Sequence, residues 1–417
     1  MVAILGYSRE QIFTAVKAMY STVAESPSSR FHFPVGDSAC RLLGYPAEQI
    51  AELPERLRES FAGVGYPFHA NAIARGDTVL DIGAGAGNDA FIASRLVGPG
   101  GHVVALDLTP AMTRKLQNTI RESGEPNISV LRASAERLPL ADVSVDSITS
   151  NGALNLVPDK RRAVAEMFRV LRPGGRLQIA DVVISRPVTV DCHTDPRLWV
   201  ECVVGATIED DFLAMFKDAG FEDIRIERSF DYFAHSPSAQ TREVAASFGA
   251  RAIELGMRRS ASAPNRAWQL MRRFSPHRLF KSMWRRGFMG VAGLAMALLA
   301  CYGTLAAAGL LALLGIGLAL NETVWAGTIA TFALLATVAI IPGVRRHRSP
   351  SPALLAVAAA GMILYALFIN YSMALELIGF LMLAGSAWWD VRLRRREEAR
   401  TLGLDTGAAW SERLTER

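Results

Sequence analysis

The chain of 417 residues contains only four cysteines, and this scarcity narrows the classes of protein to which it can belong. None of Cys40, Cys192, Cys202 and Cys301 forms a C-x-x-C pair. A disulfide framework is therefore excluded, and a reducing compartment fits better. The first residues also lack a basic start followed by a long apolar run, so we expect no cleaved signal.

Charged residues are nearly absent from 287–389, which is rich in Leu, Ala and Gly, whereas the residues before it have the composition of a soluble protein. Apolar stretches of this length span membranes. The net charge of +5 and the pI near 9.2 are compatible with nucleic-acid binding. However, Lys and Arg cluster beside the apolar segments, which indicates a membrane surface. We therefore expect a lipid bilayer as a partner and no nucleic acid.

The apolar part divides into segments that are each long enough to cross a bilayer. The expected spans are 287–320, 324–342, 353–370 and 373–389. Basic groups precede the first span, separate the second from the third and follow the fourth, while the loops "NET" and "NYS" contain no Lys or Arg. Because basic loops stay in the cytoplasm, we expect a multi-pass protein of the inner or plasma membrane with both termini cytoplasmic. The alternative, a packed soluble helical domain, would need more polar helix faces.

The segment "ACYGTLAAAGLLALLGIGLALNETVWAG" resembles the MerC-type mercury-resistance membrane proteins. Those proteins use paired cysteines, whereas only Cys301 is present here, which argues against mercury transport. Glu376 lies close to the expected end of a span. It is a functional candidate because acids inside membranes are costly, although its side chain can also reach the polar interface.

Before the membrane part, short apolar runs alternate with helical patterns from residue 76 to about 185. This alternation predicts a parallel sheet covered by helices on both faces, that is, an α/β fold of the Rossmann-like type. The expected domains are a helical cap, the sheet domain, a basic connector, the four-helix membrane domain and a cytoplasmic tail. Their expected boundaries are 1–75, 76–236, 237–286, 287–390 and 391–417.

The run "VLDIGAGAGNDAFIASRL" reads as a strand, a glycine turn and a helix. Gly83, Gly85 and Gly87 allow the backbone to approach a ligand where a Cβ would collide, and the helix directs free N–H groups to the same place. Asp107 ends the next strand, where an acid can bind both ribose hydroxyls. It can equally cap the helix that begins "TPAM". The spacing G-x-G-x-G, rather than G-x-G-x-x-G, argues against a pyrophosphate.

With "ASAERLPLADVSVDSITSN" and "RVLRPGGRLQIAD", the series resembles the class I S-adenosylmethionine (SAM) methyltransferases over residues 75–185. The resemblance implies that SAM is the cofactor and that the strand ends hold it. The residues implied for this site are Asp81, Gly83, Gly85 and Gly87 near the methionine part, Asp107 with Leu108 at the ribose, Ala135 and Glu136 near the adenine, and Asn151 on the sulfonium side.

Four stretches narrow the likeness further, namely "GYPAEQIAELPERLRESFAGVGYP", "LDLTPAM", "SNGALNLVPDKRRAVAEMFRVLRPGGRLQIAD" and "LWVECVVGA". They resemble the arsenite methyltransferase family, which holds trivalent arsenic with cysteine thiolates. Cys202 matches one family thiol, but the two others fall on Gly152 and Val64. Either the acceptor is no longer arsenite, or Cys40, Cys192 and Cys202 rebuild a thiol site; a lone cysteine is usually a small buried apolar residue.

Aromatic stretches near the N-terminus, "FHFPVG" and "YPFHA", are expected to form a lid over the site. A general base is needed only if the acceptor carries a proton. His69 is the first candidate and His32 the second, although both can simply pack in a helical cap. Asn151, His69 and Cys202 are therefore the candidate catalytic residues, and we expect no metal cofactor.

The sequence as a whole favours a membrane-anchored SAM-dependent methyltransferase that acts on a small-molecule acceptor. Two alternatives stay open. The acceptor can be a lipophilic molecule or lipid at the membrane surface, or the chain can be a metal or metalloid transporter whose soluble domain only senses SAM.

Overall fold

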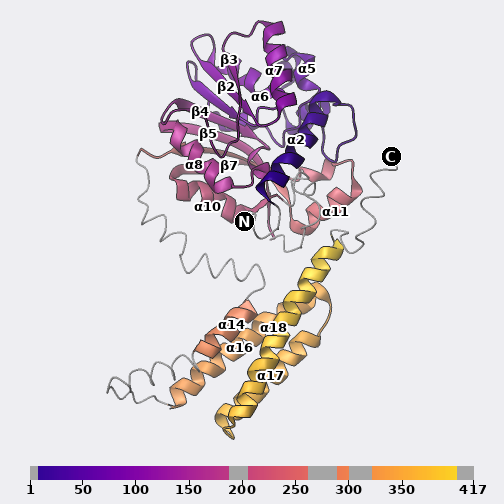
Figure 1. The fold of residues 1–417 in the computed structure, drawn as a ribbon, viewed down its shortest axis with the longest axis vertical. Helices are drawn as coiled ribbons and strands as arrows, with labels where there is room; N and C mark the ends of the chain where they lie inside the picture. Colours follow the sequence, from indigo (N-terminus) through magenta and orange to yellow (C-terminus); the bar gives the residue numbers. More distant parts are fainter. Residues whose placement is uncertain (1–7, 187–204, 262–288, 300–321, 402–417) are drawn as a thin grey trace. The chain divides into compact units, whose positions relative to one another are not determined.

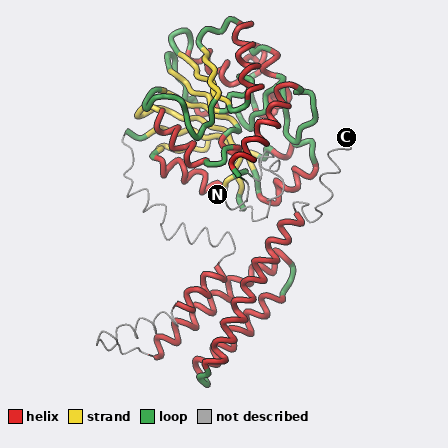
Figure 2. Tube along the Cα trace, viewed as in Figure 1, coloured by secondary structure: helices red, strands yellow, loops and turns green. Residues whose placement is uncertain are grey.

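The computed structural model describes residues 8–186, 205–261, 289–299 and 322–401. The chain divides into two compact units, Met1–Arg273 and Phe274–Arg417. Figure 2 shows that the described strands all belong to the first unit and that the described part of the second unit consists of helices.

The first unit is built on one sheet of eight strands in the order β3-β2-β1-β4-β5-β8-β7, with the short β6 paired to β5. The strands are β1 Thr78–Ile82, β2 His102–Asp107, β3 Ile128–Arg132, β4 Val145–Asn151, β5 Leu171–Ile184, β6 Thr207–Ile208, β7 Phe221–Phe230 and β8 Arg251–Arg259. Strands β1 to β6 pair in parallel, whereas β8 is antiparallel to both of its neighbours. The α/β, Rossmann-like class predicted from the sequence is confirmed.

This strand order fixes where a ligand can bind. The chain leaves β1 toward β2 on one side and reaches β4 on the other, so the connections diverge between β1 and β4. In open α/β sheets, ligands bind at the carboxyl ends of the strands at such a point. The glycine turn follows β1 at this edge of the sheet.

Helices cover both faces of the sheet, with α8 and α10 on one side and α2, α5, α6 and α7 on the other (Figure 1). The helices of this unit are α2 Arg9–Glu25, α3 Asp37–Leu43, α4 Ala47–Glu52, α5 Glu55–Arg58, α6 Asn88–Val97, α7 Pro110–Ser123, α8 Lys160–Val170, α10 Glu209–Ala219 and α11 Ala239–Phe248, with short 3-10 turns η1 Pro67–Ala70, η2 Leu154–Leu156 and η3 Phe233–His235. Strand residues such as Leu80, Ile148 and Ile179 are fully buried between the two helical layers. These continuous apolar runs are typical of parallel strands covered on both faces.

The sheet extends beyond residue 236, where the sequence suggests that a basic connector begins. Residues 239–248 form α11, and β8 lies between β5 and β7 inside the sheet. In β8, Ile253, Leu255 and Met257 alternate into the core, whereas Glu254 points to the other face of the sheet. The sequence indicated a polar connector here because the segment contains Glu254 and ends in two arginines.

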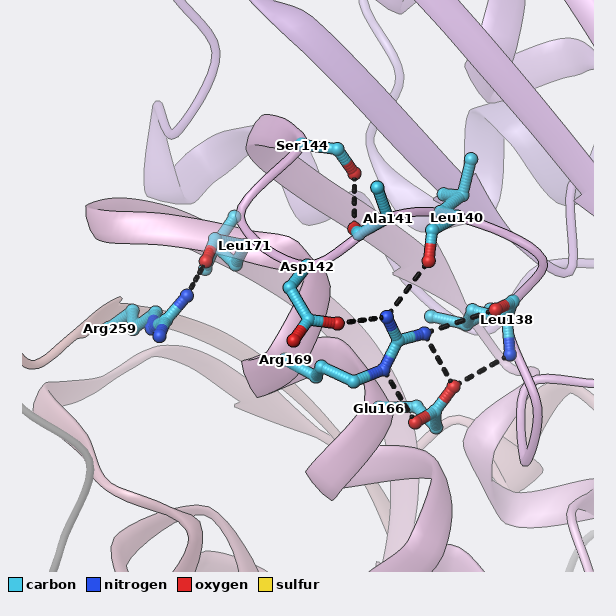
Figure 3. Close-up of polar contacts among 9 residues, drawn as sticks. All are labelled: Leu138, Leu140, Ala141, Asp142, Ser144, Glu166, Arg169, Leu171 and Arg259. Carbon is cyan, nitrogen blue, oxygen red and sulfur yellow. Dashed lines mark hydrogen bonds and ion pairs between the residues drawn. The ribbon is translucent and has the colours of Figure 1, made fainter.

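Arg169 of α8 braces the loop that leads into β4 (Figure 3). Its guanidinium donates to the carbonyls of Leu138 and Leu140 at 3.0 and 2.8 Å, to Asp142 at 2.7 Å and to both carboxylate oxygens of Glu166 at 2.8 Å. Glu166 also accepts from the Leu138 N–H at 2.8 Å. The hydrogen bonds from Arg169 lower the pKa of Glu166. A bidentate pair of this kind has fixed geometry, so it holds the loop to the helix.

The described helices of the second unit are α14 Met289–Leu298, α16 Glu322–His347, α17 Ser351–Phe368 and α18 Met373–Thr401. Among the described residues, three segments are long and apolar enough to cross a membrane: Ala326–Arg345, Ser351–Phe368 and Met373–Arg394. They coincide with the second, third and fourth expected spans. The first expected span begins as α14, and most of it lies outside the described residues, so the number of passes stays a prediction.

We expect Arg169→Met to loosen the loop at 138–144, because the substitution leaves two loop carbonyls and Glu166 without their donor. The free energy of unfolding of the first unit should fall by roughly 2 kcal/mol. Hydrogen exchange should rise at 138–144 and not in the exposed-arginine control Arg162→Met on the same helix. The pKa of Glu166 is lowered from its ordinary value of 4.5. Its ionised carboxylate therefore stabilises the folded state fully above pH 4.5, and this stabilisation is lost as the pH falls below that value. Equal exchange in the two variants would contradict the bracing role.

Candidate functional site

A cavity of about 970 Å³ opens at the carboxyl ends of β1, β2 and β4. Its floor is the strand ends and the turns that follow them, and its roof comes from the N-terminal helices. The floor includes Asp81, Gly83, Gly85, Asp107, Leu108, Ala135, Asn151 and Gly152, and the roof includes Phe13, Val16, Tyr20, Leu57 and Phe61. The wall is thus apolar on the roof side and carries its acids on the floor.

The glycine turn between β1 and α6 is packed too closely against its neighbours to accommodate side chains at two of its positions. Gly83 and Gly87 have φ angles of +77° and +106°, and a Cβ on them would lie 2.3 Å from Ala153 and 2.2 Å from Leu116. At Gly85 the nearest atom to such a Cβ is the Met112 sulfur at 4.0 Å, so a side chain there would enter the cavity. The turn therefore brings bare backbone to the cavity wall, as a bound ligand requires.

Asp107 ends β2 and ties the glycine turn to the start of α7. Its carboxylate accepts from the Gly85 N–H at 2.9 Å and from the Thr109 N–H at 2.7 Å. The carboxylate lines the cavity, where it would face a bound ribose. The alternative role as helix cap is wrong, because the N-cap of α7 is Thr109, and Asp107 accepts from the N–H of that residue, which precedes the helix.

Acidic groups are concentrated and buried on the cavity floor. Burial raises the pKa of Asp81, Asp89 and Asp107, and for Asp81 the neighbouring Asp89 and Asp107 raise the pKa further. Asp81 is 1% exposed, and one of its carboxylate oxygens accepts no hydrogen bond in the structure. A cationic ligand in this cavity would stabilise the ionised forms. An amino group together with a sulfonium, as in SAM, fits these residues.

Asn151 connects the end of β4 to α6 and to the N-terminal region. Its side-chain oxygen accepts from the N–H groups of Val64 and Gly65 at 2.8 and 3.2 Å. Its amide nitrogen donates to the Gly65 carbonyl at 2.8 Å, to Asp89 at 3.0 Å and to the Tyr45 hydroxyl at 3.0 Å. The Tyr45 hydroxyl donates to Asp89 at 2.6 Å. Asn151 therefore positions the loop around residue 64 at the edge of the cavity.

Val64 and Gly152, the two positions at which the resemblance places absent thiols, face each other. A Cβ built on Gly152 would lie 3.3 and 3.5 Å from the two methyl groups of Val64. The φ angle of Gly152 is +71°, a conformation that side chains disfavour. The valine methyl groups thus pack where a side chain at 152 would begin, directly behind Gly152 in the cavity wall.

Two of the residues implied near the adenine lie differently from each other. Ala135 lines the cavity, as does Leu108 near the ribose position. The Glu136 side chain is fully buried outside the cavity lining, where it pairs with Arg9 of α2 and accepts from the Asp159 N–H at 2.6 Å. Glu136 therefore fastens the start of α2, the helix that supplies part of the roof.

The histidine candidates are not part of the described cavity wall. The Nδ1 atom of His69 lies 2.6 Å from the carboxylate of Glu254 in β8, and the ring packs edge-on against Tyr66. His32 packs edge-on against Phe33. The expected aromatic lid is thus replaced, in the described part of the chain, by Phe13 and Tyr20 of α2 and by Phe61.

Only one of the cysteines can be placed. Cys40 is fully buried in α3, and burial with the nearby Asp89 and Asp37 raises the pKa of its thiol to about 12. It is therefore protonated near neutral pH and is a poor thiolate ligand. Cys192, Cys202 and Cys301 lie outside the described residues. Within the described ranges, no group of three His, Cys, Asp or Glu residues could hold a metal ion.

Several cavity residues were not anticipated from the sequence. Asp89 follows the glycine turn directly, and its place in the first turn of α6 was a usable signal, because an acid there faces the same edge as the turn. Phe13, Val16 and Tyr20 follow a helical spacing in α2 that reads equally well as ordinary core packing.

Two family models match the chain. The methyltransferase domain model matches residues 73–220, and the MerC mercury resistance protein model matches residues 288–392. Both resemblances inferred from the sequence are confirmed. The MerC match, together with the three apolar helices, fits an all-helical membrane region.

Curated relatives match the first part of the chain. The arsenite methyltransferase of Halobacterium salinarum is 41% identical over 189 residues, which cover 45% of this chain and 48% of that protein. The arsenite methyltransferase of Mus musculus is 33% identical over 187 residues, or 40% and 50% of the two chains. The chain thus spans about half the length of these relatives. The ubiquinone/menaquinone biosynthesis C-methyltransferase of Escherichia coli is 32% identical over 182 residues, or 38% and 72%.

Among solved structures, an arsenic(III) S-adenosylmethionine methyltransferase from Chlamydomonas reinhardtii is 32% identical. The match covers 52% of this chain and 73% of that one, with a TM-score of 0.44.

We expect Asn151→Ala to release the loop around residue 64, since Val64, Gly65, Asp89 and Tyr45 each lose a partner. The free energy of unfolding should fall by about 3 kcal/mol. Hydrogen exchange at 61–66 should rise, whereas Asn118→Ala on the exposed face of α7 should leave exchange there unchanged. If exchange at 61–66 stays at the wild-type rate, the loop is held by something other than Asn151.

Proposed function

This chain belongs to the S-adenosylmethionine-dependent methyltransferases, and we propose that it transfers a methyl group from SAM to a small acceptor. The observation that supports the proposal best is the cavity at the ends of β1, β2 and β4, where a turn without side chains meets buried acids. Such a site accepts a cationic nucleoside and disfavours an anionic dinucleotide.

Within this proposal, each floor residue has a separate task in holding the cofactor. Asp81, with its unpaired oxygen, would bind the amino group of the methionine part, and the backbone from Gly83 to Gly85 would lie against it. Asp107 would bind the ribose hydroxyls, and Ala135 would lie beside the adenine. When bound, SAM supplies a methyl carbon that is made electrophilic by the sulfonium.

The protein contributes mainly position and exclusion of water, which matter most in an in-line displacement. The roof residues Phe13, Tyr20 and Phe61 shield the cavity, and Asn151 fixes the neighbouring loop. An acceptor that carries a proton would need a base, and no histidine of the described cavity wall supplies one, because His69 pairs with Glu254 outside that wall.

Trivalent arsenic is the first acceptor we propose, because two arsenite methyltransferases are 41% and 33% identical to the chain over 189 and 187 residues. A soft centre requires thiolates. Since Cys40 is buried and protonated, the thiols would have to come from Cys192 and Cys202.

A lipophilic small molecule is the second candidate, and a different observation favours it. Val64 packs against Gly152 and the cavity roof is apolar, so the described wall suits an acceptor without charge. The similarity to a quinone C-methyltransferase over 72% of its length fits this alternative.

We propose further that the helical unit anchors the chain in a membrane by four spans, with the termini on the cytoplasmic side. The support is the distribution of charge, since Arg345 to Arg348 and Arg392 to Arg396 flank the described spans at matching ends. This orientation keeps the methyltransferase unit where SAM is synthesised.

Asp107→Ala should weaken SAM binding by about 100-fold, because the ribose loses its acceptor and Gly85 loses the group that orders the turn. Calorimetry with SAM and with S-adenosylhomocysteine measures the effect, and Glu122→Ala on the exposed face of α7 is the matched control. An unchanged affinity in the Asp107 variant would refute the assignment of the ribose site.

Affinity for SAM should fall as the pH is lowered through the raised pKa values of Asp81 and Asp107. The pKa values of Asp81 and Asp107 are raised in the free protein, so a cation binds fully above them and must compete with protons below them. Asp81→Asn should weaken binding at high pH and flatten the profile. S-adenosylhomocysteine, which has no sulfonium, should show a shallower dependence, and an equally steep one would argue against charge recognition.

The acceptor can be identified by assaying S-adenosylhomocysteine release from labelled SAM with arsenite, selenite, mercury, quinones and phenols. If arsenic is the acceptor, Cys202→Ser should abolish turnover while SAM affinity is retained. If the acceptor is lipophilic, that variant should be active, and deletion of 287–417 should raise the apparent KM. Release with none of these acceptors would favour a SAM-sensing role for the first unit.

A further inference from the structure

The end of α18 that contains its arginines has two chemically different faces. On the buried face, Asp390 accepts from the Nε2 atom of His347 at 3.0 Å and from the Nε atom of Arg394 at 2.8 Å. The His347 and Asp390 side chains are 2% exposed and that of Arg394 is 10% exposed. The charge of Arg394 is thus neutralised inside the helical unit, as buried charges generally must be.

The other face carries a groove of about 720 Å³ between α17 and α18, which lie side by side in Figure 1. It is lined by Leu355, Gly385, Trp388, Trp389, Arg392 and Arg396. A Cβ built on Gly385 would meet no atom within 4 Å, so this glycine keeps the apolar end of the groove open without being required by helix packing.

In the part of the chain that the structure describes, the two arginines of the groove have no partner of opposite charge. No carboxylate of the described chain is paired with Arg392 or Arg396, which lie one helical turn apart on the same face. The Arg392 guanidinium lies 5.0 Å from the centre of the Trp388 ring, and that tryptophan is 61% exposed. The cation–π contact holds the guanidinium over the mouth of the groove.

We propose that this groove binds the headgroup of an anionic phospholipid, with the phosphate between Arg392 and Arg396 and an acyl chain along Leu355 and Gly385. The inference rests on the proposed insertion of the helical unit in a membrane. The apolar span ends at Arg394, so the groove crosses from hydrocarbon to the polar interface, where tryptophan and arginine are enriched. An occupant that is anionic at one end and apolar at the other matches both halves.

Native mass spectrometry of the full chain, released from bilayers of phosphatidylglycerol and phosphatidylcholine in equal amounts, tests the proposal. The wild type should retain phosphatidylglycerol in preference. The double variant Arg392→Gln/Arg396→Gln should lose this preference by about 30-fold, since each arginine contributes roughly fivefold near an anionic surface. Arg345→Gln, an exposed arginine of α16 outside the groove, is the matched charge control.

A second variant tests the groove itself without removing charge. Gly385→Leu fills the apolar end and should reduce lipid retention, whereas Gly361→Leu on α17, also open to its surroundings, should not. Leucine favours helix over glycine, so neither change should unfold the unit. Equal retention in these two variants, or no preference for phosphatidylglycerol in the wild type, would overturn the proposal.

Two further results distinguish failure of the lipid site from failure of the proposed membrane insertion on which it rests. If the chain leaves the membrane fraction on alkaline carbonate washing, insertion itself fails and both proposals fall. If the chain stays in the membrane but the variants behave alike, only the lipid site is refuted. Displacement of the lipid by free glycerophosphate would also refute it, because the groove would then recognise phosphate without the acyl chain.

Discussion

The concentration of carboxylates away from water at the ends of β1 and β2 is the constraint around which the first unit is organised. Burial raises the pKa of Asp81, Asp89 and Asp107, and the charges of Asp89 and Asp107 raise the pKa of Asp81 further. Asp107 is compensated by two backbone N–H groups, and Asp89 by Tyr45 and Asn151. One carboxylate oxygen of Asp81 accepts no hydrogen bond, so the negative charge that the chain does not stabilise lies where a cationic ligand would bind.

The same network determines the shape of the neighbouring wall. Asn151 satisfies Asp89 with one end and holds the N–H groups of Val64 and Gly65 with the other. This places Val64 against Gly152. Gly152 has a positive φ angle, which glycine adopts readily. The two positions that the family likeness assigns to thiols are thus in contact. A thiol placed at only one of them would meet either the valine methyl groups or a residue without a side chain, so this contact couples the residue types at 64 and 152.

The strands and the glycine turn were predictable because their signals are local. Strands β1 and β2 are apolar runs that each end at a turn or a polar residue, and Gly83 to Gly87 mark the turn directly. Strand β4, with the sequence VDSITSN, was recognised by its place in the series of strands and helices. β8 was missed although Ile253, Leu255 and Met257 alternate, because Glu254 and the terminal arginines dominate its composition. The charge of Glu254 is explained only by tertiary contacts with His69 and the Tyr66 N–H. The roof was missed for a similar reason, since Phe13 and Tyr20 lie far from the strands in sequence.

Each unit contains charged groups that have partners inside the chain and charged groups that line a cavity or groove without such a partner. Asp89 and Arg394 are buried and matched inside the chain, and such groups support the fold. Asp81 has an oxygen that no group in the chain satisfies, although it is 1% exposed. Arg392 is held over a groove by an aromatic ring and not by a carboxylate. Asp81 is buried, so the opposite charge would have to come from a ligand, the proposed cation. Arg392 is exposed to solvent, so its recess favours the proposed anionic headgroup without requiring it.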